Sequence, residues 1–462
     1  MKNKKKILSL IACLSLLSSC NSDRNGNRYC LISTTPDISN STPDPIPNKS
    51  VEELNKELFE NYINTSKEND GTLCLLNFKD EIPEEYLNLE TIIIPESIND
   101  VNLTIINNVI DGTFSRFIEV KTIKIPSTIS IIKVSLNKEN SSPFVNLPNL
   151  ENIEVDANNE YYYSKGNCLI KNSNNTIICG WKNVEIPDEI TTTVRDYAFS
   201  NNKSISTIKL HPNVSISSYS FKYIDNLTGV DLNGKTGFTL DGNTIYNDGS
   251  TIYAAWGNVT ISSSVPVVSL DGYSSVTSVL LKDGVYNLRE YAFRGTKIKS
   301  LKIPASVSKM NATTFDGLTD IENIEIDANN KYFEVNGNCI LSLSSSSPSI
   351  YYAYGDAVIP DYKNTLASNA LQSCYSLKSL TFHNKFVAID KNCFSLLPDT
   401  DKFTTIKFKG TIAEFKEIKR SASLYDVLKD RTTLNVEFLE TIDGVNWTVK
   451  DTYKMSELEN IN

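Results

Sequence analysis

One short pattern recurs along most of the chain and limits what it can fold into. Alternating apolar residues precede a proline, and an aromatic residue follows roughly ten residues later, often in the pair Ala-Phe. Such apolar runs make strands of about three or four residues, and proline ends them because it has no amide hydrogen to donate. The proline ends are Ile92-Ile93-Ile94-Pro95, Ile123-Lys124-Ile125-Pro126, Val184-Glu185-Ile186-Pro187, Leu301-Lys302-Ile303-Pro304 and Val358-Ile359-Pro360.

The aromatic residues set the period. Phe199 lies 22 residues before Phe221, and Phe293 lies 22 before Phe315. One turn of this length cannot bury its apolar face alone, but stacked turns share a continuous core. We therefore expect a solenoid of parallel strands with an internal stack of aromatic rings, here called the spine. Its expected members are Phe199, Phe221, Phe293, Phe315 and Phe394, with Leu371 in a further spine position.

The repeats also resemble a known family. RDYAFSNNKSISTIKLHPNVSISSYSF and REYAFRGTKIKSLKIPASVSKMNATTF are similar to the BspA-like leucine-rich repeat family of bacterial surface proteins. The resemblance covers about residues 85–410, with degenerate turns over 85–150. It implies a right-handed, β-rich leucine-rich-repeat solenoid with a parallel sheet and repeats of about 22–23 residues. The family pattern falls on Ala198-Phe199, Ala292-Phe293, Cys374 and Leu377.

A second, longer repeat interrupts the first. ENIEVDANNEYYYSKGNCLI, from Glu151, returns as ENIEIDANNKYFEVNGNCIL, from Glu322, at an offset of 171 residues. LDGNTIYNDGSTIYAAWGN, from Leu240, is a third version. Each predicts two short strands around a polar turn, that is, a β-hairpin inserted sideways into the solenoid. The hairpins are expected at about 156–181, 240–257 and 327–354.

The N-terminus resembles an export signal followed by a site of lipid attachment. Residues 1–20 are MKNKKKILSLIACLSLLSSC, a lysine-rich start and an apolar run too short to span a bilayer. The ending Leu17-Ser18-Ser19-Cys20 resembles a bacterial lipobox, which implies a lipoprotein signal peptide over 1–19 and lipid attachment at Cys20. An ordinary secretory signal is the alternative. The polar, proline-containing residues 20–49 predict a disordered tether.

Both ends of the solenoid carry signals for caps. Ser50 and Glu53 have capping-box spacing, and apolar residues at helical spacing predict a helix to about Ser66. Residues 50–84 are thus expected to form an N-terminal cap of helix and strand, with a partner-binding helix as the alternative. Residues 408–438 resemble the family's terminal unit. We therefore expect a C-terminal cap and tail over 411–462, with a capping helix over the last sheet edge and a loosely held tail after about Asp443.

Few residues suggest catalysis or metal binding. The chain has two histidines, His211 and His383, and both adjoin the position that other repeats give to proline, which indicates a structural role. No G-x-S-x-G, H-E-x-x-H or phosphate-loop motif occurs, so no catalytic residue, cofactor or metal site is predicted. Calcium at Asp156 or its copy Asp327 is the alternative to a turn that bonds its own backbone.

Two cysteines are candidates for a disulfide bond. If Ser173 and Asn174 form a two-residue turn, Cys168 and Cys179 face each other across the hairpin. An oxidising compartment would then allow a disulfide between them. The alternative is a pair of unbonded, buried cysteines.

Aromatic residues around the hairpins are the candidate ligand contacts. Tyrosine and tryptophan offer rigid contact area with a polar edge, which suits a surface for protein or sugar. The alternative is that they pack on the flank of their own solenoid. The candidate contacts are Trp181, Trp256, Tyr352 and Tyr354.

The net charge narrows the range of partners. It is −10, and removal of residues 1–19 takes away four lysines and no acid, which gives −14. Such a chain repels nucleic acid and anionic membrane surfaces. We expect a protein of the cell envelope, anchored by lipid to the outer membrane and exposed at the cell surface. Its expected partner is an extracellular protein of a host or another bacterium; glycan capture is the alternative, and an unrecognised enzyme comes third.

Overall fold

In the computed structural model the chain divides into two units, Met1–Lys49 and Ser50–Asn462. In the first, β1 (Asn21–Ser22) pairs antiparallel with β2 (Arg28–Tyr29). The expected signal peptide and Cys20 lie outside the described residues, so both stay predictions. The described residues are 21–22, 28–29, 49–109, 112–135, 141–188, 192–247, 251–343, 349–363, 365–366, 371, 373–385, 388–389, 393–394, 402–418, 428 and 430–461.

The second unit begins with the expected capping box. Ser50 Oγ accepts a hydrogen bond from the Glu53 amide (3.1 Å), and the Glu53 carboxylate accepts one from the Ser50 amide (2.8 Å). The helix, α2 (Val51–Asn61), ends earlier than the expected Ser66. The reason is β3 (Ile63–Lys67), which pairs antiparallel with β4 (Leu73–Phe78).

A side chain of α2 closes the first edge of the solenoid. Asn55 is buried; its amide nitrogen donates to the carbonyl oxygen of Thr91 (3.0 Å), and its amide oxygen accepts from the Ile93 amide (2.8 Å). These are the backbone groups of β5 (Thr91–Ile93), the first strand of the main ladder described next. The helix therefore satisfies backbone groups that an open edge would offer to another chain.

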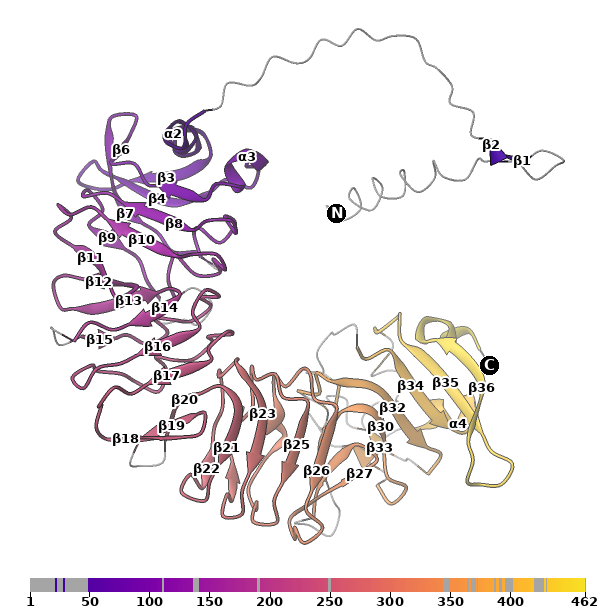
Figure 1. Cartoon of the computed structure of the whole chain (residues 1–462). Helices are drawn as coiled ribbons and strands as arrows, with labels where there is room; N and C mark the ends of the chain where they lie inside the picture. Colours follow the sequence, from indigo (N-terminus) through magenta and orange to yellow (C-terminus); the bar gives the residue numbers. More distant parts are fainter. Residues whose placement is uncertain are drawn as a thin grey trace. The chain divides into compact units, whose positions relative to one another are not determined.

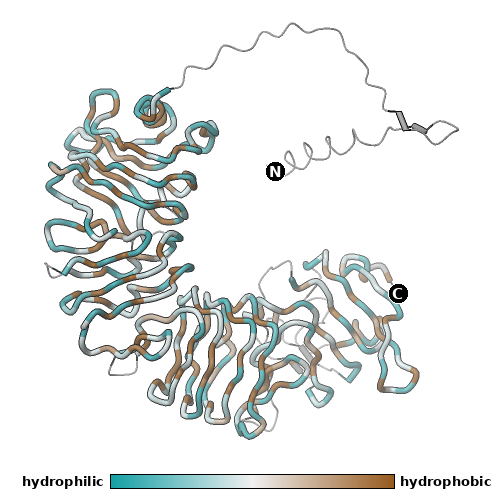
Figure 2. The backbone as a smooth tube through the Cα atoms, in the orientation of Figure 1, coloured by the Kyte–Doolittle hydropathy of each residue, from teal (hydrophilic) through white to brown (hydrophobic). Residues whose placement is uncertain are grey.

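Short parallel strands follow one another in chain order through the second unit (Figure 1). Their inward side chains are apolar and buried while alternate side chains face outward, which gives the alternating colours along the strands in Figure 2. We call these strands the main ladder. It comprises β5, β8 (Thr122–Ile125) and β10 (Asn152–Val155); β14 (Asn183–Glu185), β16 (Thr207–Lys209) and β17 (Gly229–Asp231); β21 (Gly257–Ile261), β23 (Val276–Leu281), β25 (Ser300–Ile303) and β26 (Asn323–Ile326); and β30 (Gly355–Val358), β32 (Leu377–His383), β34 (Thr405–Lys409) and β35 (Asn435–Glu440).

A second set of parallel strands runs along the other side of the turns, so that a turn carries two strands rather than one. We call it the second ladder. Its paired strands are β4, β7 (Val101–Ile106) and β9 (Ile131–Ile132); β13 (Thr176–Gly180) and β15 (Thr193–Val194); β22 (Val267–Val268) and β24 (Asn287–Leu288); and β31 (Thr365–Leu366) and β33 (Ala388–Ile389). Shorter elements are β6 (Ser97–Ile98), α3 (Glu84–Leu87) and η2 (Ala312–Phe315).

The expected spine residues are all buried between the two ladders. Phe199 stacks on Phe221 and Phe293 on Phe315, each pair with ring centroids 6.3 Å apart. The degenerate first turns have a spine of their own that the 22-residue period misses. There Phe114 stacks on Phe144 at 5.5 Å, 30 residues further along the chain.

Three antiparallel meanders interrupt the solenoid where hairpins were expected. Each has three strands instead of two, because the chain returns once more before rejoining the main ladder. The apolar core correspondingly falls into three clusters that adjoin at the first two meanders. The meanders are β11 (Tyr162–Lys165), β12 (Cys168–Lys171) and β13; β18 (Phe238–Asp241), β19 (Thr244–Asn247) and β20 (Ile252–Ala255); and β27 (Phe333–Asn336), β28 (Cys339–Ser342) and β29 (Ser349–Ala353).

The C-terminal cap differs from the expectation in two ways. The helix α4 (Ile412–Glu417) forms, and its Phe415 packs on Phe408 and Phe438. The last edge of the main ladder, however, is taken by β36 (Thr448–Lys454), antiparallel to β35. The tail is not loose, because η3 (Met455–Asn460) follows with buried side chains of Met455 and Leu458. Among the described residues, no helix has the length and apolar content to cross a membrane.

Candidate functional site

The four aromatic residues expected to contact a ligand lie in the interior. Trp181, Trp256, Tyr352 and Tyr354 are all buried, so that expectation does not agree with the structure. Each meander ends on a strand that packs against the solenoid, which turns these rings inward. Tyr354, for example, exchanges hydrogen bonds of 3.1 Å through its hydroxyl with the backbone amide and carbonyl of Ile324.

The cysteine pair also differs from the expectation. A β-bulge between Leu169 and Ile170 shifts the register, so that Cys168 faces Gly180 and Cys179 faces Leu169. The two thiols are free and belong to different core clusters, and their side chains do not face each other. Burial raises the pKa of the Cys179 thiol to about 12, which leaves it protonated and unreactive.

The aspartates considered for calcium bond their own turns. The carboxylates of Asp156 and Asp327 accept from the amides of Asn158 (2.8 Å) and Asn329 (2.9 Å). The two carboxylates therefore serve to stabilise the turns that lead into the meanders. In the described part of the chain, no group of three or more His, Cys, Asp or Glu side chains could hold a metal ion.

Both histidines are buried and bonded. His383 Nε2 lies 2.9 Å from the carbonyl oxygen of Lys363. His211 Nε2 lies 2.8 Å from Thr192 Oγ1, while its Nδ1 accepts from the Asn213 amide (3.1 Å). This arrangement requires the neutral ring of His211, and burial lowers its pKa, with Lys235 adding to the effect and Asp188 opposing it.

His211 should therefore make stability depend on pH. With a lowered pKa in the folded state, the unfolded state binds the proton more readily below about pH 6.5. As the pH decreases below about 6.5, the free energy of unfolding is then expected to decrease by up to ~1.4 kcal/mol per pH unit, until the pH is below the folded-state pKa. Urea unfolding at pH 7.5 and pH 5.5 should show a smaller loss in His211→Gln than in the wild type. Equal losses in both proteins would contradict this role of His211.

Two surfaces remain as candidates for binding. The first, here called the open face, is the outward side of β21, β23, β25 and β26. Thr260, Leu280, Lys302 and Glu325 lie in register across it, and the Leu280 side chain is 52% exposed. Lys302 has no ion-pair partner among the described residues. The second row of the open face consists of Asn258, Ser278, Ser300 and Asn323.

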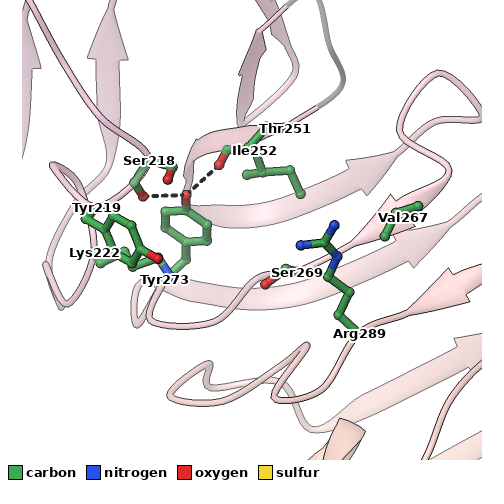
Figure 3. A pocket seen from close by; sticks show the side chains of 9 residues that line it. All are labelled: Ser218, Tyr219, Lys222, Thr251, Ile252, Val267, Ser269, Tyr273 and Arg289. Carbon is green, nitrogen blue, oxygen red and sulfur yellow. Dashed lines mark hydrogen bonds between the residues drawn. The ribbon is translucent and has the colours of Figure 1, made fainter.

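The second surface is a pocket of about 290 Å³ on the flank beside the second meander, here called the flank pocket (Figure 3). It opens between β20 and β22. The corresponding strands at the first meander, β13 and β15, are paired, whereas among the described strands β20 pairs only with β19. The residues that line the pocket are Ser218, Tyr219, Lys222, Thr251, Ile252, Val267, Ser269, Tyr273 and Arg289.

A tyrosine and a charge cluster fix the walls of the flank pocket. Tyr273 takes a spine position, and its hydroxyl donates to the carbonyl oxygen of Ile252 (2.9 Å). Asp271 is held by Arg294 Nε (2.8 Å) and by Lys222 Nζ (3.2 Å). Burial opposes ionisation of Asp271, but the hydrogen bonds from Arg294 and the charge of Lys222 outweigh it and lower its pKa. These three side chains together carry one net positive charge, and Asp316 lies near enough to Arg294 to contribute to its raised pKa.

Sequence reasoning missed the flank pocket, although a signal was available. The residue directly after β15, β22 and β24 is Arg195, Ser269 and Arg289, and the turn of Phe221, between the first two, has Ser217 at this place. The spine positions five residues after the ends of the same strands are Phe199, Tyr273 and Phe293. The turn next to the second meander thus has a short residue and an added hydroxyl, Ser269 and Tyr273, where the turn next to the first meander has Arg195 and Phe199.

Several solved structures are similar to the chain at low identity. A leucine-rich cell surface protein of Faecalibacterium prausnitzii is 14% identical, covers 79% of this chain and 97% of its own, and has a TM-score of 0.27. A leucine-rich repeat protein of Bacteroides ovatus is 17% identical over 76% and 70%, with a TM-score of 0.23. The pneumococcal vaccine antigen PcpA is 12% identical over 75% and 72%, with a TM-score of 0.24.

The repeat region determines the family to which the chain belongs. No curated protein was found to be similar in sequence. The family described as "BspA type Leucine rich repeat region" matches in six copies over residues 177–251, 256–348 and 354–422, just over half of the chain. The match spans the main ladder from β14 to β34 and includes both candidate surfaces. The chain therefore belongs to the BspA-type leucine-rich repeat family.

Proposed function

We propose that this chain is a cell-surface recognition protein that binds another protein through its open face. The observation that carries the proposal is Leu280, an exposed apolar side chain at the centre of four parallel strands. Around it lie polar side chains and the unpaired Lys302. An apolar centre with a polar rim is the usual anatomy of a protein-binding site.

The proposed setting supports this role. A signal peptide over residues 1–19 and a lipid on Cys20 would hold the protein on the outer membrane, with residues 20–49 as the tether. The solenoid is proposed to wind right-handed, as connections between parallel strands almost always do. Adhesion to a host protein or to another bacterium is then the expected biological role, by analogy with the family.

Leu280→Arg should weaken binding to the partner by about tenfold or more, because it replaces an apolar anchor by a charge. The measurement is binding of the purified full chain to a panel of immobilised extracellular-matrix proteins and to cells of other bacteria. Ile131→Arg is the matched control, since Ile131 is 47% exposed on the second ladder. Thermal unfolding of both variants verifies that the fold is kept.

Two outcomes would contradict the proposal. One is that no member of the panel binds the wild-type protein saturably. The other is that Leu280→Arg and Ile131→Arg reduce binding equally, because the open face would then have no special part in it.

A further inference from the structure

The flank pocket lies next to the second meander, at a place that a side chain fills next to the first meander. Arg195 directly follows β15, and its guanidinium donates to the carbonyl oxygens of Ile178 (3.1 Å) and Ser135 (2.9 Å). Ser269 takes the same position after β22. A serine side chain lacks the length to fill that space, and the hollow next to β20 is left open. The pocket is therefore a difference between two copies of one repeat and not a general property of the solenoid.

The flank pocket is lined to receive an anion. Arg289 is exposed, its guanidinium points toward the middle of the pocket (Figure 3), and it has no ion-pair partner among the described residues. Lys222 lines the opposite wall as part of the cluster with one excess positive charge, and its side chain is only 10% exposed. No described lining residue is acidic. The pocket lining therefore has two cationic and no described acidic side chains, in a chain of net charge −10.

We propose that the flank pocket binds the carboxylate-bearing sugar residue of an acidic glycan, of the uronic or sialic acid class. The planar fork of Arg289 matches a carboxylate through two parallel hydrogen bonds. The hydroxyls of Ser218, Thr251 and Ser269 line the pocket and can exchange hydrogen bonds with those of a sugar. Tyr219 is 44% exposed and adds aromatic C–H surface to the wall, with Lys222 Nζ 4.9 Å from the centre of its ring.

The geometry favours a sugar over a peptide. An extended peptide would bind by adding a strand to the free edge of β20. The carbonyl oxygen of Ile252, which lies on that strand in the pocket, already accepts from the Tyr273 hydroxyl at 2.9 Å. The volume of about 290 Å³ is also at the small end for ligand pockets and suits one sugar residue. This site is separate from the open face and does not depend on the protein partner proposed for it.

The test is titration of the purified full chain with small probes, followed by saturation-transfer NMR. The probes are the methyl glycosides of N-acetylneuraminic acid and glucuronic acid, with methyl glucoside as the neutral sugar and a tetraglutamate peptide as the acidic peptide. We expect saturable binding of at least one acidic sugar and at least tenfold weaker binding of methyl glucoside. Arg289→Gln should weaken the acidic sugar tenfold or more, as the loss of a charged hydrogen-bond pair requires.

Two further variants separate the pocket from general electrostatics. Lys282→Gln removes an exposed positive charge that lies seven residues before Arg289 and does not line the pocket, and it should change binding less than twofold. Ser269→Arg introduces the arginine found at this place next to the first meander. It should abolish binding by filling the pocket, although it adds a positive charge. The proposal is overturned if no acidic sugar binds, if methyl glucoside binds equally well, if tetraglutamate binds more tightly, or if Arg289→Gln and Lys282→Gln behave alike.

Discussion

Replacing Phe293 with alanine is expected to lower the free energy of unfolding by about 3–5 kcal/mol, among the largest effects of any single substitution in this chain. Phe293 is fully buried, lies between β24 and β25, and stacks on Phe315. Its removal leaves a cavity that the turns on either side cannot fill, because their own rings are fixed in the same stack. Urea unfolding followed by circular dichroism gives the value.

Tyr286→Ala is the control for that substitution. Tyr286 belongs to the same turn but is 40% exposed, and its replacement should cost no more than about 1 kcal/mol. Similar losses in the two variants would mean that the spine contributes nothing beyond ordinary surface packing.

Gly166→Ala is expected to destabilise the protein by about 3 kcal/mol or more. Gly166 lies in the turn between β11 and β12 at φ = +60°, which is unfavourable for alanine. Its carbonyl oxygen also accepts from the Glu185 amide at 2.9 Å, so the turn sits directly on β14. A Cβ at this position would overlap the carbonyl oxygen of Glu185, and backbone atoms cannot move away as a flexible side chain could.

The second meander provides a matched control for Gly166. Gly242 lies in the turn between β18 and β19 at φ = +55°, but a Cβ there meets nothing within 4 Å. Gly242→Ala should therefore cost only the conformational penalty of about 1–2 kcal/mol. Thermal unfolding of the two variants measures the difference. If both unfold at the same temperature, the meander turn is not docked on the main ladder as described.

The solenoid was predictable because its signal is repeated. The 22-residue spacing that relates Phe199 to Phe221 also relates Phe293 to Phe315, and buried rings at that spacing can only stack. The first turns hid the same arrangement, since the second ladder there has longer strands and Phe114 and Phe144 are 30 residues apart. A search for one fixed period cannot find turns of another length.

Local irregularity accounts for the errors around the meanders. One residue more in β13 than in β12 makes a bulge, which alone separates Cys168 from Cys179. The third strand of the meander accounts for Trp181. It places this side chain in the core, whereas a two-stranded hairpin would have left it on the flank. Neither a bulge nor a third strand has a distinct sequence signature in so short a segment. The flank pocket depends on the unpaired edge of β20 together with the short Ser269, and this combination becomes visible only when the turns next to the meanders are superposed.

The most direct test of the account is native-state hydrogen exchange of the wild type and of Phe293→Ala. In this fold the repeat turns hold each other folded through a shared core. The amides of β23, β25 and β26 should therefore lose protection together in the variant, although Phe293 belongs to none of these strands. Loss of protection confined to the turn that contains Phe293, with β23 and β26 exchanging as in the wild type, would contradict the claim.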